Sequence, residues 1–589
     1  MAAATEQVYF DAAGRRIAEG RRLGWIDVVV VVAILVLLGI VLVLGGDMRA
    51  RFDELHAPPI DLSPVHIPYY TARTVLRMFI AFGAALLFTF VWGYVCAKSP
   101  RARRVMLPAL DILQSVPVLG FLSITVTGFL ALFPGSLLGV ECASIFAIFT
   151  AQAWNMTFGF YHSLVTIPAE LQEAARVYKL NAWQRFTKVE VPASTIGLMW
   201  NSMMSFGGGW FFVAQSEAIS VMNKNIKLPG LGSYIAAAAE AGDGRATLYA
   251  IVAMVVTIVV IDQVLWRPLV AWAERFKLEQ TESQTQQSSW MLDLLRRSVL
   301  VAWASARIGA AFGGVTQRAS VAVADARAAV VAATPAPARR MIRISAWLAV
   351  ALLLAWLARE ALDIGRQIRT ELTPADMLRV VWLGVLTLLR VVAMTILATV
   401  IWTPVAVWIG SRPKIARIAQ PLAQIAASFP VNMTFPVVVA LFLAIHLPIN
   451  WGSILLMALG TQWYILFNVI AGAMAIPTDL AEASRLFGLP TWKRWTTLII
   501  PAIFPFWVTG ALTATGGAWN ASIVAEVATW GDHRLVADGL GAYIAGVTEK
   551  GDQPAIYFSI GVMAVFVVLI NRVLWRRLYA LAEQRFKLD

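Results

Sequence analysis

Two glutamates, Glu217 and Glu526, are the residues of this 589-residue sequence whose chemistry most needs an explanation, because each stands near the end of a long apolar stretch. A carboxylate at the middle of a bilayer costs roughly 2.5–3.5 kcal/mol, so such a side chain normally faces a cavity or a partner. We interpret both glutamates as wall residues of a path for a solute. Exposure at the membrane interface is the alternative interpretation.

The rest of the sequence offers no pattern that is typical of catalysis or metal binding. The five histidines are scattered, and Cys96 and Cys142 lie in or beside separate apolar runs without the paired spacing of metal ligands. Nothing resembles a hydrolytic triad or a glycine-rich phosphate loop that is followed by Lys and Ser or Thr. We therefore expect no catalytic residue and no metal site.

Residues close to the two glutamates, and two proline-bearing segments, complete the predicted path. Paired glycines precede each glutamate and permit a close helix approach or a kink. The tryptophans that follow the glycines could line the path, or they could pack against lipid. A polar asparagine is present in the second half only, so we expect any solute site to be asymmetric. The predicted path residues are Glu217, Glu526, Trp210, Trp519, Gly207, Gly516, Pro117, Pro430 and Asn432.

The composition shows which solvent surrounds these residues. The chain is 59% hydrophobic and only 14% charged, whereas soluble proteins carry about 25% charged residues. Lipid must therefore surround much of the chain, and only helices or closed barrels satisfy their backbone groups there. The long uninterrupted apolar runs favour helices. The net charge of +13 lies in clusters between these runs, which is typical of positive-inside anchoring and not of nucleic-acid binding.

An internal repeat settles the expected architecture. Thr74-Val-Leu-Arg77 recurs as Thr387-Leu-Leu-Arg390 at a shift of 313, and Gly230-Leu-Gly232 recurs as Gly539-Leu-Gly541 at a shift of 309. Many single residues match at the same two shifts, which chance does not produce over about 200 residues. The chain is therefore two copies of one unit joined head to tail.

Each copy contains about six predicted spans. They lie near 26–45, 72–97, 107–133, 138–161, 194–219 and 246–268, and near 343–359, 380–410, 420–446, 451–474, 502–528 and 554–575. A basic cluster precedes the first span of the chain, and another follows the second span in each half. Basic residues mark the cytoplasmic side, so we expect the N-terminus in the cytoplasm. Because six is even, the copies are parallel and the C-terminus is cytoplasmic too.

The predicted division of the chain follows from the repeat. The first transmembrane domain covers 1–278 and the second covers 342–589, with a cytoplasmic linker at 279–341 between them. The linker begins with a polar stretch and continues with apolar residues mixed with arginines. This pattern predicts a partly amphipathic helix on the inner membrane surface, and a plain tether is the alternative.

A loop between the fourth and fifth spans of each half, at 167–192 and 476–501, is the most informative segment. Each loop opens with a proline that suits a first helical turn, and acidic residues follow near the positive end of that helix. Gly488 suits a left-handed C-terminal stop. Asn181 with Gln184, or Pro490 alone, can start a second short helix. We expect two short helices and a tight turn that fit a groove on a cytoplasmic partner.

These loops resemble the EAA loop of ABC importer permeases, in which Glu-Ala-Ala is followed by Gly at the sixth position after Glu. The second half has Glu482, Ala483, Ser484 and Gly488. The first half has Glu173, Ala174 and Ala175, but Lys179 stands where the family has Gly. A left-handed residue other than Gly costs on the order of 1 kcal/mol, so the first turn is either strained or of another type.

The flanking segments look like those of the nitrate, taurine and aliphatic-sulfonate permeases of that family. Trp183-Gln-Arg-Phe186, the Gly-Leu-Gly segments and Pro430-Val-Asn-Met-Thr-Phe-Pro436 carry this resemblance, which covers about 70–278 and 380–589. It implies an all-α membrane protein with the type I ABC importer permease fold. It also implies the bacterial inner membrane and a small anionic solute that moves by alternating access.

The same resemblance implies partners that supply what this chain lacks. Each loop would dock on one of two copies of a cytoplasmic ATPase, and ATP and Mg would bind there and not to this chain. A periplasmic or lipid-anchored binding protein would deliver the solute.

Two other classes of protein are alternatives. A secondary transporter of the major facilitator type also has two parallel six-span halves and needs no ATPase. The two loops, and the absence of deeply buried Arg–Asp pairs for proton coupling, favour the importer. A membrane-embedded enzyme would need a metal cluster or paired catalytic acids at membrane depth, and the sequence offers neither.

Overall fold

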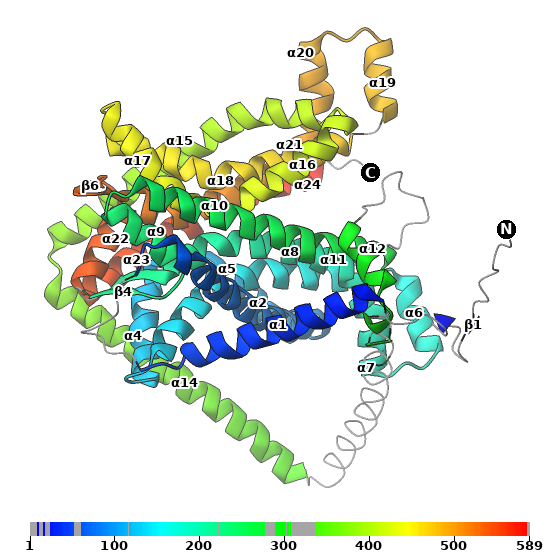
Figure 1. The fold of residues 1–589 in the computed structure, drawn as a ribbon, viewed down its shortest axis with the longest axis horizontal. Helices are drawn as coiled ribbons and strands as arrows, with labels where there is room; N and C mark the ends of the chain where they lie inside the picture. The colour runs from blue at the N-terminus through cyan, green and yellow to red at the C-terminus, as the bar shows by residue number, and fades with distance from the viewer. Residues whose placement is uncertain are drawn as a thin grey trace. The chain divides into compact units, whose positions relative to one another are not determined.

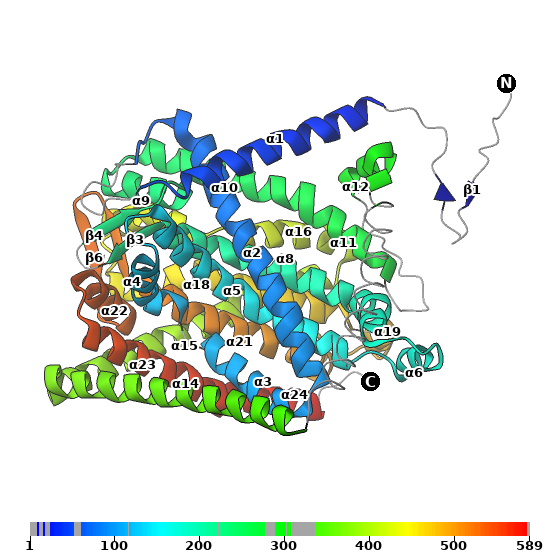
Figure 2. The same ribbon diagram turned by 90° about the horizontal axis from the view of Figure 1, so that it is seen from below.

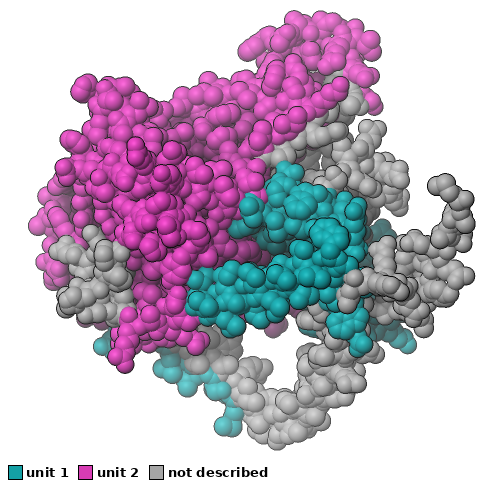
Figure 3. All heavy atoms as spheres, in the orientation of Figure 1, with its two compact units in different colours: residues 1–45, 159–201, 260–359 teal, residues 46–158, 202–259, 360–589 magenta. Residues whose placement is uncertain are grey.

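The computed structural model describes residues 9–10, 16–17, 24–51, 60–115, 117–221, 224–276, 289–301, 303–304, 307, 336–476 and 478–585. The chain forms two compact units, residues 1–45, 159–201 and 260–359, and residues 46–158, 202–259 and 360–589 (Figure 3). The boundaries between these units fall inside helices. The predicted linker 279–341 lies mainly outside the described residues, so the predicted domain boundaries stay a prediction.

The described chain is almost entirely helical, as the apolar runs predict (Figure 1). The first repeat contains α1 (Trp25–Asp47), α2 (Ile67–Lys98), α3 (Pro100–Ser115), α4 (Leu122–Leu132), α5 (Leu137–Val165), α6 (Ala169–Val177), α7 (Ala182–Arg185), α8 (Val191–Glu217), α9 (Leu231–Glu240), α10 (Gly244–Ile261) and α11 (Arg267–Ala273). The linker contributes α12 (Trp290–Arg297).

The second repeat follows the same order. It contains α14 (Ala336–Glu371), α15 (Pro374–Gly410), α16 (Pro413–Ser428), α17 (Phe435–Ala444), α18 (Ile449–Met474), α19 (Thr478–Leu486), α20 (Thr491–Arg494), α21 (Ile500–Ala525), α22 (Leu540–Lys550), α23 (Gln553–Ile570) and α24 (Arg576–Arg585). The correspondence of elements confirms that the chain is a tandem repeat.

Three short antiparallel hairpins accompany the helices in the described part of the chain. The hairpin of β1 (Tyr9–Phe10) and β2 (Arg16–Ile17) lies near the N-terminus. The other two follow α8 and α21, and consist of β3 (Ala218–Val221) with β4 (Lys224–Lys227) and of β5 (Val527–Trp530) with β6 (His533–Val536). Within the unit that contains them, these two hairpins lie at one end with α9 and α22, and α19 lies at the opposite end (Figures 1 and 2).

Eight described helices or helix runs are long and apolar enough to span a membrane, or nine if a bent pair counts as one span. They are Trp25–Asp47, Pro64–Lys98, Leu137–Val165, Gly244–Ala273, Pro374–Gly410, Ile449–Met474, Thr491–Ala525 and Gln553–Ala582. The predicted span at 194–219 corresponds mainly to α8 and the one at 343–359 lies within α14, and neither helix is among the eight. This count confirms a multi-span helical protein with fewer clear spans than the six per half that the sequence suggests.

The third spans predicted near 107–133 and 420–446 are interrupted in the structure. Each is broken into two helices, α3 with α4 and α16 with α17, and a short 3₁₀ segment follows Pro117 or Pro430. The pieces 422–428 and 431–444 differ in direction by 78°. Proline lacks an N–H group and disfavours a helical conformation in the residue before it, so the helix ends at that point. The two proline segments therefore form corners and not span interiors.

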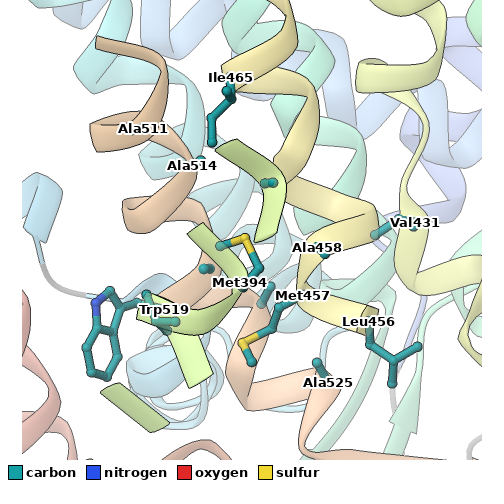
Figure 4. Close-up of a cluster of buried hydrophobic side chains, with 14 of the residues drawn as sticks. Met394, Val431, Leu456, Met457, Ala458, Ile465, Ala511, Ala514, Trp519 and Ala525 are labelled. Atoms are coloured by element: carbon teal, nitrogen blue, oxygen red, sulfur yellow. The ribbon is translucent and has the colours of Figure 1, made fainter. Parts of the chain in front are cut away.

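Helices α15, α18 and α21 form the main core of the larger unit. Small residues on α21, among them Ala511, Ala514 and Ala518, are fully buried against α18, whose Ile465 and Met457 are buried too (Figure 4). Small side chains let helix backbones approach closely, which is how helices associate where lipid removes the hydrophobic drive.

Candidate functional site

Glu217 lies at the centre of a buried polar cluster at the end of α8. Its side chain has no exposed surface. One carboxylate oxygen accepts hydrogen bonds from the Thr74 hydroxyl at 2.7 Å and from Arg77 Nη1 at 2.6 Å, and the other accepts from the Gly232 amide at 2.7 Å. The Thr74 hydroxyl also accepts from the Leu231 amide at 3.0 Å. The cluster thus ties α2 to the start of α9.

The Gly-Leu-Gly segments are explained by this cluster. A Cβ atom at Gly230 would overlap the Glu217 carboxylate, and one at Gly232 would overlap the backbone of Ala214. Gly539 and Gly541 stand in the same relation to Glu526 and to Ser522 of α21. Because the backbone must approach this closely for its amides to reach the carboxylate, only glycine fits at these positions.

A second acid extends the cluster in the first repeat. Arg77 donates from Nε and Nη2 to the two oxygens of Glu141 at 2.6 and 2.7 Å, and Arg73 also pairs with Glu141. All three side chains are fully buried. Two arginines therefore face two glutamates, which leaves this group without net charge.

The second repeat builds a smaller version of the same cluster. Glu526 accepts from the Thr387 hydroxyl at 2.8 Å, from Arg390 Nη1 at 3.0 Å and from the Ala542 amide at 3.1 Å. By the repeat shifts, Leu386 takes the place of Arg73 and Asn450 takes the place of Glu141. The Asn450 side-chain oxygen accepts from Arg390 at 2.9 Å. One arginine and one glutamate remain, so this cluster is neutral too.

These contacts decide between two interpretations of the glutamates. Exposure at the interface is wrong for both, because neither side chain is exposed. Both face partners within the protein, and a place in the path wall stays a prediction. The structure also corrects one argument about proton coupling. Deeply buried Arg–Glu pairs are present, so the expected absence of buried Arg–Asp pairs does not by itself argue against a proton-coupled transporter.

The tryptophans and Gly207 of the predicted path are buried in the protein interior, whereas Gly516 is exposed. Trp210 and Trp519 are each 1% exposed, so neither packs against lipid in this structure. A Cβ atom at Gly207 would come within 2.6 Å of the Ser428 hydroxyl on α16, whereas one at Gly516 would meet nothing within 4 Å. Gly207 therefore permits a close contact between the repeats, and Gly516 stands beside open space.

The two proline corners contact the fifth span of the opposite repeat. Asn432 Nδ2 donates to Gln215 Oε1 of α8 at 3.0 Å. The Val118 amide, next to Pro117, donates to Asn520 Oδ1 of α21 at 2.9 Å. Sequence reasoning predicted Asn432 but missed Gln215 and Asn520, because nothing in a single chain indicates which helices cross.

A polar cavity of about 180 Å³ lies beside the first of these contacts. Gln215, Lys227, Glu240 and Asn432 line it together with smaller residues. Of the predicted path residues, only Asn432 is among its lining. Charged and amide groups that converge on a small cavity are typical of a site for a small polar ligand.

The two loops form helical hairpins with the same turn. Lys179 has a φ of 50° and Gly488 has a φ of 63°. The Leu180 amide donates to the Ala175 carbonyl at 3.0 Å, and the Leu489 amide donates to the Ser484 carbonyl at 3.2 Å. This is a Schellman turn at both places. Of the two alternatives for the first turn, the strained one is therefore correct.

The second short helix of each hairpin runs directly into the fifth span. Asn181 and Gln184 form the predicted capping box, with bonds of 2.8 and 3.1 Å. A π-helical turn at Phe186–Glu190 joins α7 to α8, and one at Trp495–Ile499 joins α20 to α21. Pro192 and Pro501 explain both turns, because proline has no N–H and its ring clashes with the carbonyl four residues earlier. A force on the hairpin therefore reaches the fifth span through continuous helix.

The hairpin tips carry exposed apolar side chains. Val177 and Tyr178 are each 78% exposed, and Leu486 and Phe487 are 87% and 82% exposed. Glu173, Ala174, Lys179, Glu482 and Gly488 are exposed, Ala483 is half-buried, and Ala175 and Ser484 are buried. Exposed apolar groups that gather at a projecting tip mark an interaction site. In the larger unit, α19 and α20 stand clear of the helices around them (Figure 1).

Both halves of the chain are similar to known proteins. The chain matches the family model described as "Binding-protein-dependent transport system inner membrane component" twice, over residues 89–265 and 402–588. Both matched segments contain a hairpin and a fifth span. The two halves of the chain are therefore two copies of one family domain.

Several named relatives are similar to one repeat. The bicarbonate transport system permease protein CmpB of Synechocystis sp. is 26% identical over 200 residues, which are 32% of this chain and 62% of the relative. The nitrate import permease protein NrtB of Leptolyngbya laminosa is 23% identical over 32% of this chain and 64% of its own length.

The glycine betaine/proline betaine transport system permease protein ProW of Salmonella typhimurium is 22% identical over 32% of this chain and 50% of its own length. The match to each of these three relatives thus spans less than two thirds of that relative. The two family matches, in contrast, cover more than half of the chain, and they confirm the resemblance seen in the loops. The chain belongs to the family of binding-protein-dependent transport system inner membrane components.

Proposed function

We propose that this chain forms the membrane-spanning part of an ATP-driven importer, with both permease halves in one polypeptide. The observation that carries the proposal is the pair of equivalent hairpins, each with the same Schellman turn and an exposed apolar tip, in two copies of one family domain. A secondary transporter has no use for two such hairpins. The family match also favours the importer over that alternative.

The hairpins would receive the motion of two cytoplasmic ATPase subunits, in which ATP and Mg would bind. Their apolar tips would enter a groove on each ATPase, and the exposed Glu173 and Glu482 would pair with cations at its rim. Because α7 and α20 continue into α8 and α21, movement of an ATPase would tilt the fifth spans. Tilting both would alternate access to the space between the repeats.

The solute and setting follow from the relatives. Two of them are named for bicarbonate and nitrate, which supports a small anion as the solute. A separate binding protein outside the cell would deliver it, as the family description indicates. The bacterial inner membrane is the proposed location, and both termini would lie on the cytoplasmic side with the hairpins.

Coupling between ATPase and permease is the property to test. The chain would be purified from native membranes with its ATPase and reconstituted in proteoliposomes that contain the binding protein. The double variant Glu482→Ala/Gly488→Ala should lose ATP-driven solute uptake while the ATPase still hydrolyses ATP. Glu371→Ala, an exposed glutamate at the end of α14, is the control and should transport normally. Normal coupled uptake by the double variant would refute the coupling role of this hairpin.

A further inference from the structure

The polar cavity beside α8 is built from residues that the repeat does not require. Gln215, Lys227 and Asn432 line it, and the repeat shifts place Val524, Val536 and Leu119 at the equivalent positions. The equivalent place on the other side of the repeat is built from the same elements with apolar residues. Maintaining the fold therefore does not explain three polar side chains that converge on one cavity.

The space itself also comes from the first copy. Ala214 and Ala218 line the cavity, and their equivalents are the larger Ile523 and Val527. Ile523 is buried. Small residues at two lining positions leave room that the second copy fills with side chain. At about 180 Å³, the cavity is smaller than the roughly 300–1,000 Å³ of sites for drug-sized ligands, so it suits a small solute.

The charged groups at the cavity indicate the class of that solute. Lys227 Nζ and Glu240 Oε2 lie 2.5 Å apart, and their side chains are 22% and 53% exposed. A partly exposed ion pair is weak, so an anion can replace Glu240 at little cost. Asn432 donates a hydrogen bond to the side-chain oxygen of Gln215. This bond fixes the orientation of the Gln215 amide, so that its nitrogen is available as a donor. An ammonium and a fixed amide donor suit the oxygens of a small oxyanion.

We propose that this cavity binds a small oxyanion, which displaces Glu240 from Lys227 and accepts a hydrogen bond from Gln215. Asn432 acts as a positioning residue through its bond to Gln215. A zwitterionic solute is the competing class, because Glu240 could hold a cationic group. The described lining contains no aromatic ring of the kind that recognises quaternary ammonium groups, and this favours the anion.

A labelling experiment tests the charge preference of the cavity without knowledge of the solute. Gln215→Cys would be introduced into the full chain with Cys96 and Cys142 replaced by Ala. Two methanethiosulfonate reagents of equal size, one anionic and one cationic, would then be compared in native vesicles. The anionic-to-cationic rate ratio should fall roughly thirtyfold with Lys227→Val, because losing one charge at close range in water disfavours the anionic reagent by about 1 kcal/mol and favours the cationic reagent by the same amount. Glu240→Gln should raise the ratio.

A matched control pair exists in the second repeat. Arg534 on β6 pairs with Glu549 on α22 at 2.7 Å, as Lys227 on β4 pairs with Glu240 on α9, but neither residue lines the cavity. Arg534→Val should leave the labelling ratio unchanged. A ratio that is unaffected by Lys227→Val, or that changes equally with Arg534→Val, would overturn the proposal.

Uptake supplies the second test, and this part rests on the proposed function. In proteoliposomes that contain the ATPase and binding protein, Lys227→Val should raise KM for bicarbonate or nitrate about tenfold, as expected for a lost hydrogen bond to a charged group. Glu240→Gln should lower it, and Arg534→Val should not change it. Glycine betaine uptake that depends on Glu240 would overturn the oxyanion assignment. Absence of ATP-driven uptake in the parent chain would refute the proposed function, while the labelling ratio still decides the cavity's preference.

Discussion

The two buried clusters make a quantitative prediction about charge balance. Arg73 and Glu141 are present together in the first repeat, and Leu386 and Asn450 are present together in the second. Both clusters are neutral. We infer that Arg73 and Glu141 are tolerated in the interior only when both are present, because each neutralises the other. The double variant Arg73→Leu/Glu141→Asn would give the first repeat the arrangement of the second, in which Arg390 binds the Asn450 oxygen at 2.9 Å.

The magnitudes follow from the contacts of each group. Glu141→Asn alone removes both ion pairs of Glu141 and leaves Arg77 paired with Glu217 and Arg73 with Asp47 at 3.9 Å. An uncompensated buried charge typically costs about 3–5 kcal/mol. The double variant leaves no unpaired charge, and replacing a buried pair by residues of similar volume is often close to neutral. The coupling energy should therefore be at least about 3 kcal/mol in favour of the double variant.

Unfolding of the purified full chain in mild detergent measures this coupling. The parent, both single variants and the double variant would be compared under one set of conditions, and the free energies combined in a double-mutant cycle. The second cluster already has Leu386 and Asn450 at these positions. The charge pair can therefore be removed, and its coupling measured, in the first repeat. Additive single effects, with a coupling below about 0.5 kcal/mol, would refute the argument from charge balance.

Three further outcomes follow from local geometry. Lys179→Gly should stabilise the first hairpin by about 1 kcal/mol, because glycine adopts a left-handed conformation without strain, and hydrogen exchange at the Leu180 amide should slow accordingly. Gly488→Ala should destabilise the second hairpin by a similar amount, because alanine adopts a left-handed conformation only with strain. Hydrogen exchange of the backbone amides in that turn should become faster, and unchanged exchange would contradict the argument from strain. Gly232→Ala should prevent accumulation of folded chain in membranes, since its Cβ would overlap the backbone of Ala214; a stable, transporting variant would contradict the close approach.

Much of this architecture could be predicted from the sequence because it depends on local signals. Apolar runs gave the helices, and the repeat shifts gave the tandem organisation. The left-handed turn at Gly488 could be predicted because glycine favours that conformation. The repeat predicts the same turn at Lys179, where the structure shows a left-handed lysine with a φ of 50°. The capping box at Asn181 is equally local, since its two partners are three residues apart.

Contacts between distant residues could not be predicted in the same way. Glu217 and Arg77 are 140 residues apart, and sequence reasoning left them in separate motifs. A signal was present, because the Thr-x-x-Arg motif and the glutamate recur together in both copies, and a buried acid needs a buried base. The broken third spans were missed for a different reason. Pro117 and Pro430 were recognised, but hydropathy alone extends a span through a corner that proline enforces.

The stoichiometry of the complex tests the central claim most directly. Native mass spectrometry of the complex purified from its own membranes would weigh the chain with its bound ATPase subunits. If one polypeptide supplies both permease halves, the mass should equal one copy of this chain and two ATPase subunits. Two copies of the chain with two ATPase subunits, or a chain that transports its solute with no ATPase bound, would contradict the account.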